Sequence, residues 1–461
     1  MDAQSVGQRR VRDVNELQSL ASAQGSEAAA AEALQLMRVL QPICRSITGN
    51  GVRETLEHVA SFVDLQKFEV PSGTRVFDWE VPKEWNIRDA WLKDPRGRTI
   101  ASLAESTLRV VSYSTPIRAR MSIAELRPHL HSLPDHPDWI PYRTSYYREA
   151  WGFCLRHREL EALSDGEYEV CIDSTLDEKG SLTYAECLLP GSSAEEFLLY
   201  THVCHPATCN DNLTGIAALA ILGRALAKVQ RRYTYRLVFA PGTIGAITWL
   251  ARNEALTGRI RHGLVTGLLG VDGPLVYKRS REGRYDIDRI AQTVLPGLER
   301  DADLRDFHPY GYDERQFCSP GFNLPVGRLT RTPNGEYPQY HTSADDLTLI
   351  DPARLAGSLR ALAGMIAAAE CNRRYRNLSP KCEPRLGARG LYRPTGGAHV
   401  PRFEESLLWV LNQSDGSRDL VDIAQRSKLS MEELAVACEA LMKTGLIEPA
   451  ETEVMTDGER S

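Results

Sequence analysis

The chain has 461 residues, 42% of them apolar and 25% charged, which are the proportions of folded globular proteins and exclude general disorder. Its 61 acidic and 55 basic residues give a net charge of −6, so no overall positive charge favours nucleic acid or an anionic membrane. The length predicts one large domain with one or two smaller ones, and no apolar run reaches the roughly 20 residues that a membrane span needs.

The first residues predict a polar leader. Residues 1–26 are rich in Ala, Ser and Gln without lasting periodicity, and a helix is expected from Ser26 until the glycines of RSITGNG. The opening MDAQSVGQRRVRDVNE lacks the apolar core of a signal peptide, and none of the ten cysteines forms a C-x-x-C pair. We therefore expect a cytoplasmic protein with mostly reduced, buried thiols.

Residues 65–156 predict a β-rich insert, because strand-like stretches such as LRVVSYS alternate with Pro and Gly. The aromatic segment WIPYRTSYYREAWGFCL closes this insert. We interpret the segment as a packed seam between insert and core, since clustered Trp and Tyr bury large areas even where no ligand is present.

Residues 27–64 and 157–378 predict an α/β domain. From Tyr168 onward, strands such as EEFLLYTHV and YRLVFAP alternate with helices such as GIAALAILGRALAKV. This alternation indicates a sheet flanked by helices, and ligand sites of such sheets lie at the carboxyl ends of the strands.

A Pro-, Gly- and Arg-rich linker, 379–400, separates this domain from a tail at 401–461 that predicts three helices and a short strand, a winged-helix-like module. Ser430 and Glu433 form a capping-box signature at the last helix. That helix, MEELAVACEALMKTG, has one lysine and three acids, so we do not expect it to bind a duplex. Packing against a partner, including a second copy of the chain, stays open.

The densest chemical signal is THVCHPATCNDNLTG at 201–215, which follows an apolar strand and precedes an amphipathic helix. His202 and His205 offer two imidazoles, and Asp211 offers a carboxylate that could bridge two metal ions. A lone HxxH is usually structural, but the Asp-Asn-x-Thr-Gly that follows favours a metal site. Cys204 and Cys209 flank the suspected site and could be ligands, but scattered cysteines in a long chain are more often packing residues.

A second cluster is EYPQYHTSADDL at 336–347. His341 could ligate a metal while Asp345 or Asp346 orients its second ring nitrogen. The alternative is a helix start, with Thr342 or Ser343 as the cap and the acids in the first turn.

Together these motifs resemble the bacterial di-zinc aminopeptidases: a strand ending in histidine, an Asp-Asn-x-Ser/Thr-Gly that opens a helix, and a final His-Thr-x-x-Asp. The phrases PICRSITGNGVRETL, DERQFCSPGFNLPVGRL and GEYPQYHTSADDL are similar to uncharacterised aminopeptidase-like proteins of that clan, which carry a β-rich insert and a winged-helix tail. The resemblance covers about residues 35–450. It implies a zinc-aminopeptidase-like mixed sheet flanked by helices.

The resemblance also implies a site. Its metal ligands would be His202 or His205, Asp211, His341 and, after the next strand, Asp272. Asp313 matches the aspartate of the loop that shapes the substrate pocket. With that aspartate, we assign Arg315 and Tyr340, from the two pocket-forming segments, to substrate binding.

The sequence departs from the family at FAPGTIGAI, 239–247. Di-zinc aminopeptidases have two adjacent glutamates there, a general base and a metal ligand, whereas this chain has Gly242 and Thr243, which can do neither. Glu314 and Glu336 are the nearest acids that could supply the base instead.

The resulting expectation is a zinc-dependent hydrolase, with one or two Zn²⁺, that cleaves an amide bond of a short peptide or an aminoacyl-bearing metabolite. Two alternatives follow from Gly242. The protein could use the metal for another acyl-group reaction, or it could be a catalytically impaired relative that binds a ligand or has a regulatory role.

Overall fold

The computed structural model describes residues 15–392 and 402–450 and divides the chain into two compact units. Unit 1 comprises residues 1–285 and 302–363, and unit 2 comprises residues 286–301 and 364–461. The candidate site lies in unit 1.

Unit 1 contains an eight-stranded mixed sheet. Its strands, in spatial order, are β1 (Gln66–Pro71), β10 (Ser181–Leu189), β12 (Thr234–Ala240), β11 (Glu196–His202), β13 (Ile260–Thr266), β16 (Val326–Thr330), β14 (Val276–Lys278) and β15 (Asp303–Arg305). The four neighbours β12, β11, β13 and β16 are parallel, so their carboxyl ends meet at one edge. This is the edge where α/β sheets bind ligands.

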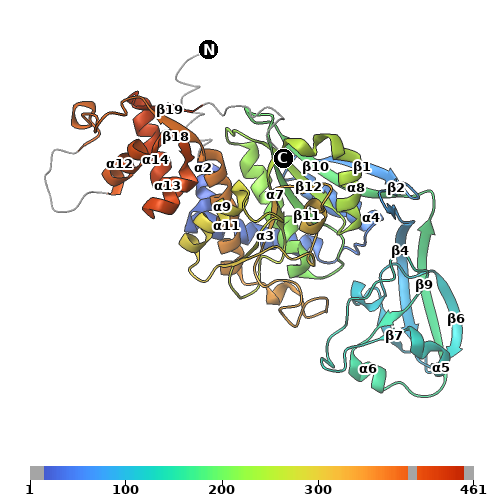
Figure 1. Ribbon diagram of the computed structural model, residues 1–461. Coiled ribbons are helices and arrows are strands. Elements are labelled where there is room, and N and C mark those ends of the chain that lie inside the picture. Colours follow the sequence, from blue (N-terminus) through green and yellow to red (C-terminus); the bar gives the residue numbers. More distant parts are fainter. Residues whose placement is uncertain (1–14, 393–401, 451–461) are drawn as a thin grey trace, which may run out of the picture. The chain divides into compact units, whose positions relative to one another are not determined.

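Helices cover both faces of this sheet (Figure 1). Successive side chains of a strand point to opposite faces. On β12, Leu237 lies against Gly223 of α7 (Thr214–Ala227), and Val238 joins the core cluster that contains Trp249 of α8 (Ile244–Asn253). Helix α7 also contacts α3 (Ala23–Leu40) and α4 (Asn50–Ala60). The expected sheet between helices is therefore confirmed.

The insert has its own antiparallel sheet, ordered β5 (Thr99–Ser102), β4 (Glu84–Lys93), β9 (Glu167–Asp177) and β6 (Ile117–Ser122). Figure 1 shows β4, β9 and β6 side by side. Two predicted boundaries between the insert and the α/β domain differ from those in the structure. Strand β9 was assigned to the core but pairs in the insert, and β1 was assigned to the insert but pairs with β10. Local sequence patterns do not encode these long-range pairings.

The smaller elements of unit 1 are the strand pairs β2 (Arg75–Val76) with β3 (Trp79–Glu80) and β7 (Leu130–His131) with β8 (Phe153–Cys154), and the short helices α5 (Ile123–Leu126), α6 (His157–Glu161) and α10 (Glu314–Phe317). Helix α11 (Pro352–Cys371) begins in unit 1 and ends in unit 2.

Unit 2 contains the helices α9 (Asp286–Leu298), α12 (Arg402–Gln413), α13 (Leu420–Ser427) and α14 (Met431–Lys443), and a sheet of β18 (Asp415–Asp419), β17 (Arg374–Asn377) and β19 (Ile447–Pro449). The capping box of Ser430 and Glu433 is present. The sheet starts before the predicted linker, because β17 pairs with both β18 and β19. Residues 393–401 of the linker and tail lie outside the described residues.

The expected leader is replaced in part by helix. Helix α2 (Asn15–Ala21) precedes α3, whose N-cap Ser22 accepts a hydrogen bond from the Gly25 N–H. The prediction of a leader without lasting structure is therefore wrong for residues 15–26, and residues 1–14 lie outside the described part of the chain. In the described ranges, no helix is both long and apolar enough to cross a membrane.

Candidate metal centre

The centre is built where β11 ends. His202 is the last residue of β11, and the chain then turns through His205 to an irregular turn, Cys209–Leu213, that leads into α7. The turn carries Asp211, which is fully buried. Ligand-bearing residues thus stand at the carboxyl end of a parallel strand and at the start of the following helix, as the sequence pattern predicts.

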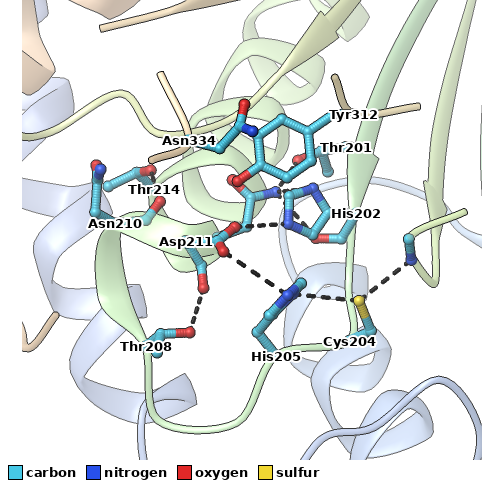
Figure 2. A network of polar contacts seen from close by, with 12 residues as sticks. Thr201, His202, Cys204, His205, Thr208, Asn210, Asp211, Thr214, Tyr312 and Asn334 are labelled. Atoms are coloured by element: carbon cyan, nitrogen blue, oxygen red, sulfur yellow. Dashed lines mark hydrogen bonds and ion pairs between the residues drawn. The ribbon is translucent and has the colours of Figure 1, made fainter. Parts of the chain in front are cut away.

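Asp211 is the focus of three imidazoles. Its Oδ1 lies 2.9 Å from His202 Nε2, and its Oδ2 lies 3.0 Å from His341 Nε2 and 3.7 Å from His205 Nε2. Figure 2 shows His202 and His205 converging on this carboxylate. One ligand atom from each of His202, His205 and Asp211 lies within 4.8 Å of the others.

Two atoms at the centre lack hydrogen-bond partners among the described residues. They are Asp211 Oδ2 and His341 Nε2, both buried, which lie 3.0 Å apart in an orientation that makes no hydrogen bond. Buried polar atoms are normally paired, and nitrogen and carboxylate oxygen atoms that face one another are the donor set that zinc prefers. The residues therefore fit a divalent cation held among them.

The protonation states of the histidine and aspartate side chains also favour binding of a cation. Burial lowers the pKa of His205 to about 3, so its imidazole is neutral at pH 7. Burial opposes ionisation of Asp211, but the neighbouring histidines, His205 first and then His202 by its hydrogen bond, hold the pKa of this carboxyl well below its usual range. Because a neutral His205 carries no charge, we attribute the lowered pKa of Asp211 to its contacts with the other two imidazoles, His202 first and then His341. Neutral imidazoles and an ionised carboxylate are the forms that bind metals.

Asp345 fixes the turn that carries Asp211. Its carboxylate accepts hydrogen bonds from the backbone N–H groups of Cys209 at 3.2 Å, Asn210 at 2.6 Å and Asp211 at 3.0 Å. The neighbouring Asp346 caps the turn Leu347–Leu349. Among the described contacts, neither acid orients the His341 ring. A helical turn does begin here, but its cap is Asp346 rather than Thr342 or Ser343, and the role of Asp345 was missed.

Aromatic rings enclose the imidazoles. Tyr312 stacks on His202 with ring centroids 5.0 Å apart, and Tyr340 stacks on His341 at 3.9 Å. Tyr142, from the insert, contacts the edges of His205 at 5.2 Å and His341 at 5.1 Å. The insert thus forms part of the wall of the centre.

The turn after β12, which contains Gly242 and Thr243, lies beside the centre. A Cβ at Gly242 would lie 3.3 Å from Cys204 Sγ and 3.7 Å from His202 Cβ. The next N–H, of Thr243, donates to Asp313 Oδ1 at 2.6 Å. The other oxygen of Asp313 is buried and has no hydrogen-bond partner in the described part of the chain. A carboxylate from another loop therefore reaches this turn.

Burial raises the pKa of Asp313 to about 6, and the nearby His202 acts against that rise. A carboxyl group with a pKa near neutrality, held in place through one oxygen, can exchange a proton at physiological pH.

A comparison with known protein families shows which family this chain belongs to. Residues 34–372 match the family described as "Domain of unknown function (DUF4910)", and residues 373–449 match a winged helix-turn-helix family. The chain belongs to the DUF4910 family.

Relatives of this DUF4910 protein support the same fold. A Clostridium acetobutylicum protein named "Putative polysaccharide biosynthesis protein with aminopeptidase-like domain" is 47% identical over 92% of this chain and 98% of its own. A crystal structure of a "putative peptidase" from that organism is 45% identical, with a TM-score of 0.88 over 93% of this chain and 98% of its own. The zinc aminopeptidase BSAP from Bacillus subtilis is 13% identical, with a TM-score of 0.54 over 74% and 94%, and shares the fold.

Several acids predicted at the site of the DUF4910 domain lie elsewhere. The Asp272 side chain is 83% exposed and pairs with Arg354 at 2.8 Å, away from the histidines. Glu314 is buried against Lys278 at 2.7 Å, with Arg328 at 3.8 Å. Glu336 is half-exposed and pairs with Arg305. These three assignments are corrected, since each carboxylate already neutralises a cation outside the centre.

The three residues assigned to substrate binding do not all lie at the centre. Tyr340 contacts His341, and Asp313 reaches the turn beside His202, whereas within the described part of the chain no contact joins Arg315 to the centre. Sequence reasoning missed Tyr142, although the aromatic segment that contains it was noticed. It also missed Arg45, a fully buried residue whose Nε donates to the His205 carbonyl at 2.9 Å. No local pattern around Arg45 marks that contact.

Proposed function

We propose that this DUF4910 protein is a zinc-dependent hydrolase that cleaves an amide bond of an aminoacyl- or acyl-bearing metabolite. The observation that carries the proposal is the buried Asp211 carboxylate, which has three imidazoles around it and one oxygen without a hydrogen bond. When bound, zinc supplies a Lewis acid that polarises an amide carbonyl and activates water.

His205, His341 and Oδ2 of Asp211 are the proposed ligands of the first ion. Oδ1 of Asp211 is engaged by His202 Nε2, while the Asn212 side-chain amide lies 3.2 Å from His202 Nδ1. Because the ionised carboxylate accepts at Oδ1, the ring proton of His202 lies on Nε2, so His202 orients the carboxylate. In this arrangement His202 is a positioning residue.

Asp313 is the proposed general base in place of the glutamate that Gly242 lacks. Its Oδ1 is fixed by the Thr243 N–H at 2.6 Å, which leaves Oδ2 to accept a proton. Removal of a general base usually costs on the order of 10²–10⁴ in rate. This residue replaces Glu314 and Glu336 as the candidate, because both are committed to ion pairs.

The name of the Clostridium acetobutylicum relative, which refers to polysaccharide biosynthesis, supports a substrate in which a sugar carries the amide. The test is hydrolysis by zinc-loaded protein of a panel of aminoacyl amides, dipeptides and N-acyl amino sugars. We expect turnover of at least one class that chelation abolishes and zinc restores. A zinc-loaded, folded protein that is inactive on the whole panel would favour the ligand-binding alternative instead.

A further inference from the structure

An exposed group of aromatic side chains lies on the β2–β3 hairpin and on the aromatic segment of the insert, and it has no role in the function proposed so far. Phe77, Trp79 and Tyr147 are 46%, 43% and 51% exposed. Trp79 contacts Tyr147 with ring centroids 5.5 Å apart, and Phe77 contacts Phe322 at 5.7 Å. We call Phe77, Trp79, Tyr147 and Phe322 the aromatic platform.

The platform rests on a rigid base. Phe77 and Trp79 stand on the β2–β3 hairpin, whose neighbouring residues Val76 and Val81 are buried in the main core of unit 1. Two backbone hydrogen bonds, Gly73 N–H to the Val81 carbonyl at 2.8 Å and Val81 N–H to the Thr74 carbonyl at 2.9 Å, close the hairpin. The exposed rings are therefore held in place.

Phe77 is an unusual residue for its position. It lies in the turn with φ 56°, in the left-handed region that favours glycine or asparagine. A bulky residue there costs on the order of 1–3 kcal/mol, and its ring remains partly in water. Folding alone explains neither the left-handed backbone conformation of Phe77 nor the exposure of its ring to water. Both features point to a role for this ring.

The platform is continuous with the wall of the metal centre. Tyr147 follows Tyr146, whose hydroxyl lies 2.8 Å from the Tyr142 hydroxyl, and Tyr142 contacts His205 and His341. Because Tyr147 is the next residue of the chain, the platform and this wall share one segment of the insert. A substrate with its amide at the centre can extend onto the platform.

Size argues against a protein partner. An aromatic side chain offers about 150–250 Å², so three of them at roughly half exposure present about 200–400 Å². A stable protein interface needs about 800 Å² from each partner. The platform is too small for a second copy of the chain but comparable to one or two sugar rings.

Charge argues for a neutral, hydroxyl-bearing ligand. Charges of both signs surround the platform: Lys83 is paired with Glu149 and Glu178, each at 3.0 Å. On the hairpin itself, Arg75 donates to the Phe77 carbonyl at 3.2 Å, and Asp78 lies between Phe77 and Trp79 in the chain. These groups can bond hydroxyls without attracting a net charge. A pyranose matches both features, because one face of its ring presents C–H groups to an aromatic ring while its hydroxyls reach a polar rim.

We propose that the aromatic platform holds a pyranose ring, so that the substrate of the metal centre is an amide carried by a sugar. This inference rests on the proposed hydrolase function for its link to catalysis, but binding can be measured without turnover.

The test is saturation-transfer difference NMR and calorimetry of the full chain with N,N′-diacetylchitobiose. We expect signals from the ring C–H protons, and an affinity that falls at least tenfold in Trp79→Ala and Tyr147→Ala but not in Tyr147→Phe, which keeps the ring. Phe403→Ala, which removes a 39% exposed aromatic ring on α12, is the control and should bind as the wild type does. Thermal unfolding checks that each variant is folded.

Three results would overturn the proposal. In the first, Trp79→Ala binds the sugar as tightly as the wild type does. In the second, a leucyl-leucine amide binds as tightly as the sugar or more tightly, and its binding also depends on Trp79. In the third, the chain self-associates and Trp79→Ala abolishes this association. Sugar binding without hydrolysis of any N-acyl amino sugar would instead leave the platform standing and count against the hydrolase function alone.

Discussion

Replacement of Asp313 by Asn tests whether this residue supplies the general base or whether the protein has no general base. Asn keeps an oxygen that can accept from the Thr243 N–H at 2.6 Å, so the loop stays anchored, while the proton-accepting oxygen is lost. We expect kcat of the zinc-loaded protein to fall by 10²–10⁴, about 3–5 kcal/mol in activation free energy, with little change in zinc content. The assay is steady-state hydrolysis of the best substrate from the panel, alongside thermal unfolding.

A second substitution sharpens this test. The backbone of Gly242 lies outside the left-handed region, and a Cβ there meets Cys204 Sγ at 3.3 Å, so Gly242→Glu needs only a small shift of the thiol. We expect Gly242→Glu to restore part of the rate lost in Asp313→Asn, and the matched Gly242→Gln to restore none. Full activity in Asp313→Asn would refute the assignment. A rise of 10² or more from Gly242→Glu alone would mean that the wild type lacks a base.

The remaining predictions concern ligands, support and acid stability. His205→Gln should lose zinc in elemental analysis, whereas His202→Gln, which keeps a donor for Asp211, should retain it; equal losses would contradict the division of roles. Asp345→Asn should weaken zinc affinity about 10–100-fold in a chelator competition, because it disturbs the three N–H contacts that hold the Asp211 turn, and unchanged affinity would dismiss that role. Arg53 lowers the pKa of Glu84, whose side chain is 11% exposed, to about 2, so this pair stabilises the fold above the unfolded pKa of about 4.5 and the effect disappears as pH falls through about 2. Glu84→Gln should therefore lower the free energy of unfolding at pH 7 by about 3 kcal/mol and flatten its pH dependence between pH 4.5 and 2, which denaturant titrations at each pH measure.

The sequence was informative where one contiguous segment encodes both structure and chemistry. THVCHPATCNDNLTG contains the end of β11, the turn and the start of α7, so His202, His205 and Asp211 could be placed from their spacing alone. The capping box at Ser430 was predictable for the same reason, since both partners lie within one turn of α14.

Long-range contacts were not predictable. Tyr142 meets the centre because its N–H donates to the His341 carbonyl at 2.8 Å, a contact between residues far apart in the chain. Asp272 was misplaced because the loop after β13 buries Val271 and then turns its next side chain outward to Arg354. The pairing of β9 with β4 likewise depends on the folded insert rather than on the alternation of strands and helices.

Zinc content tests the central claim most directly. The wild type, loaded with zinc and freed of excess metal, should contain at least one zinc ion per chain by elemental analysis. Asp211→Ala should contain none while remaining folded, and Asp272→Ala, which removes an exposed aspartate bound to Arg354, should match the wild type. Stoichiometric zinc in Asp211→Ala, or its loss in Asp272→Ala alone, would contradict the metal centre described above.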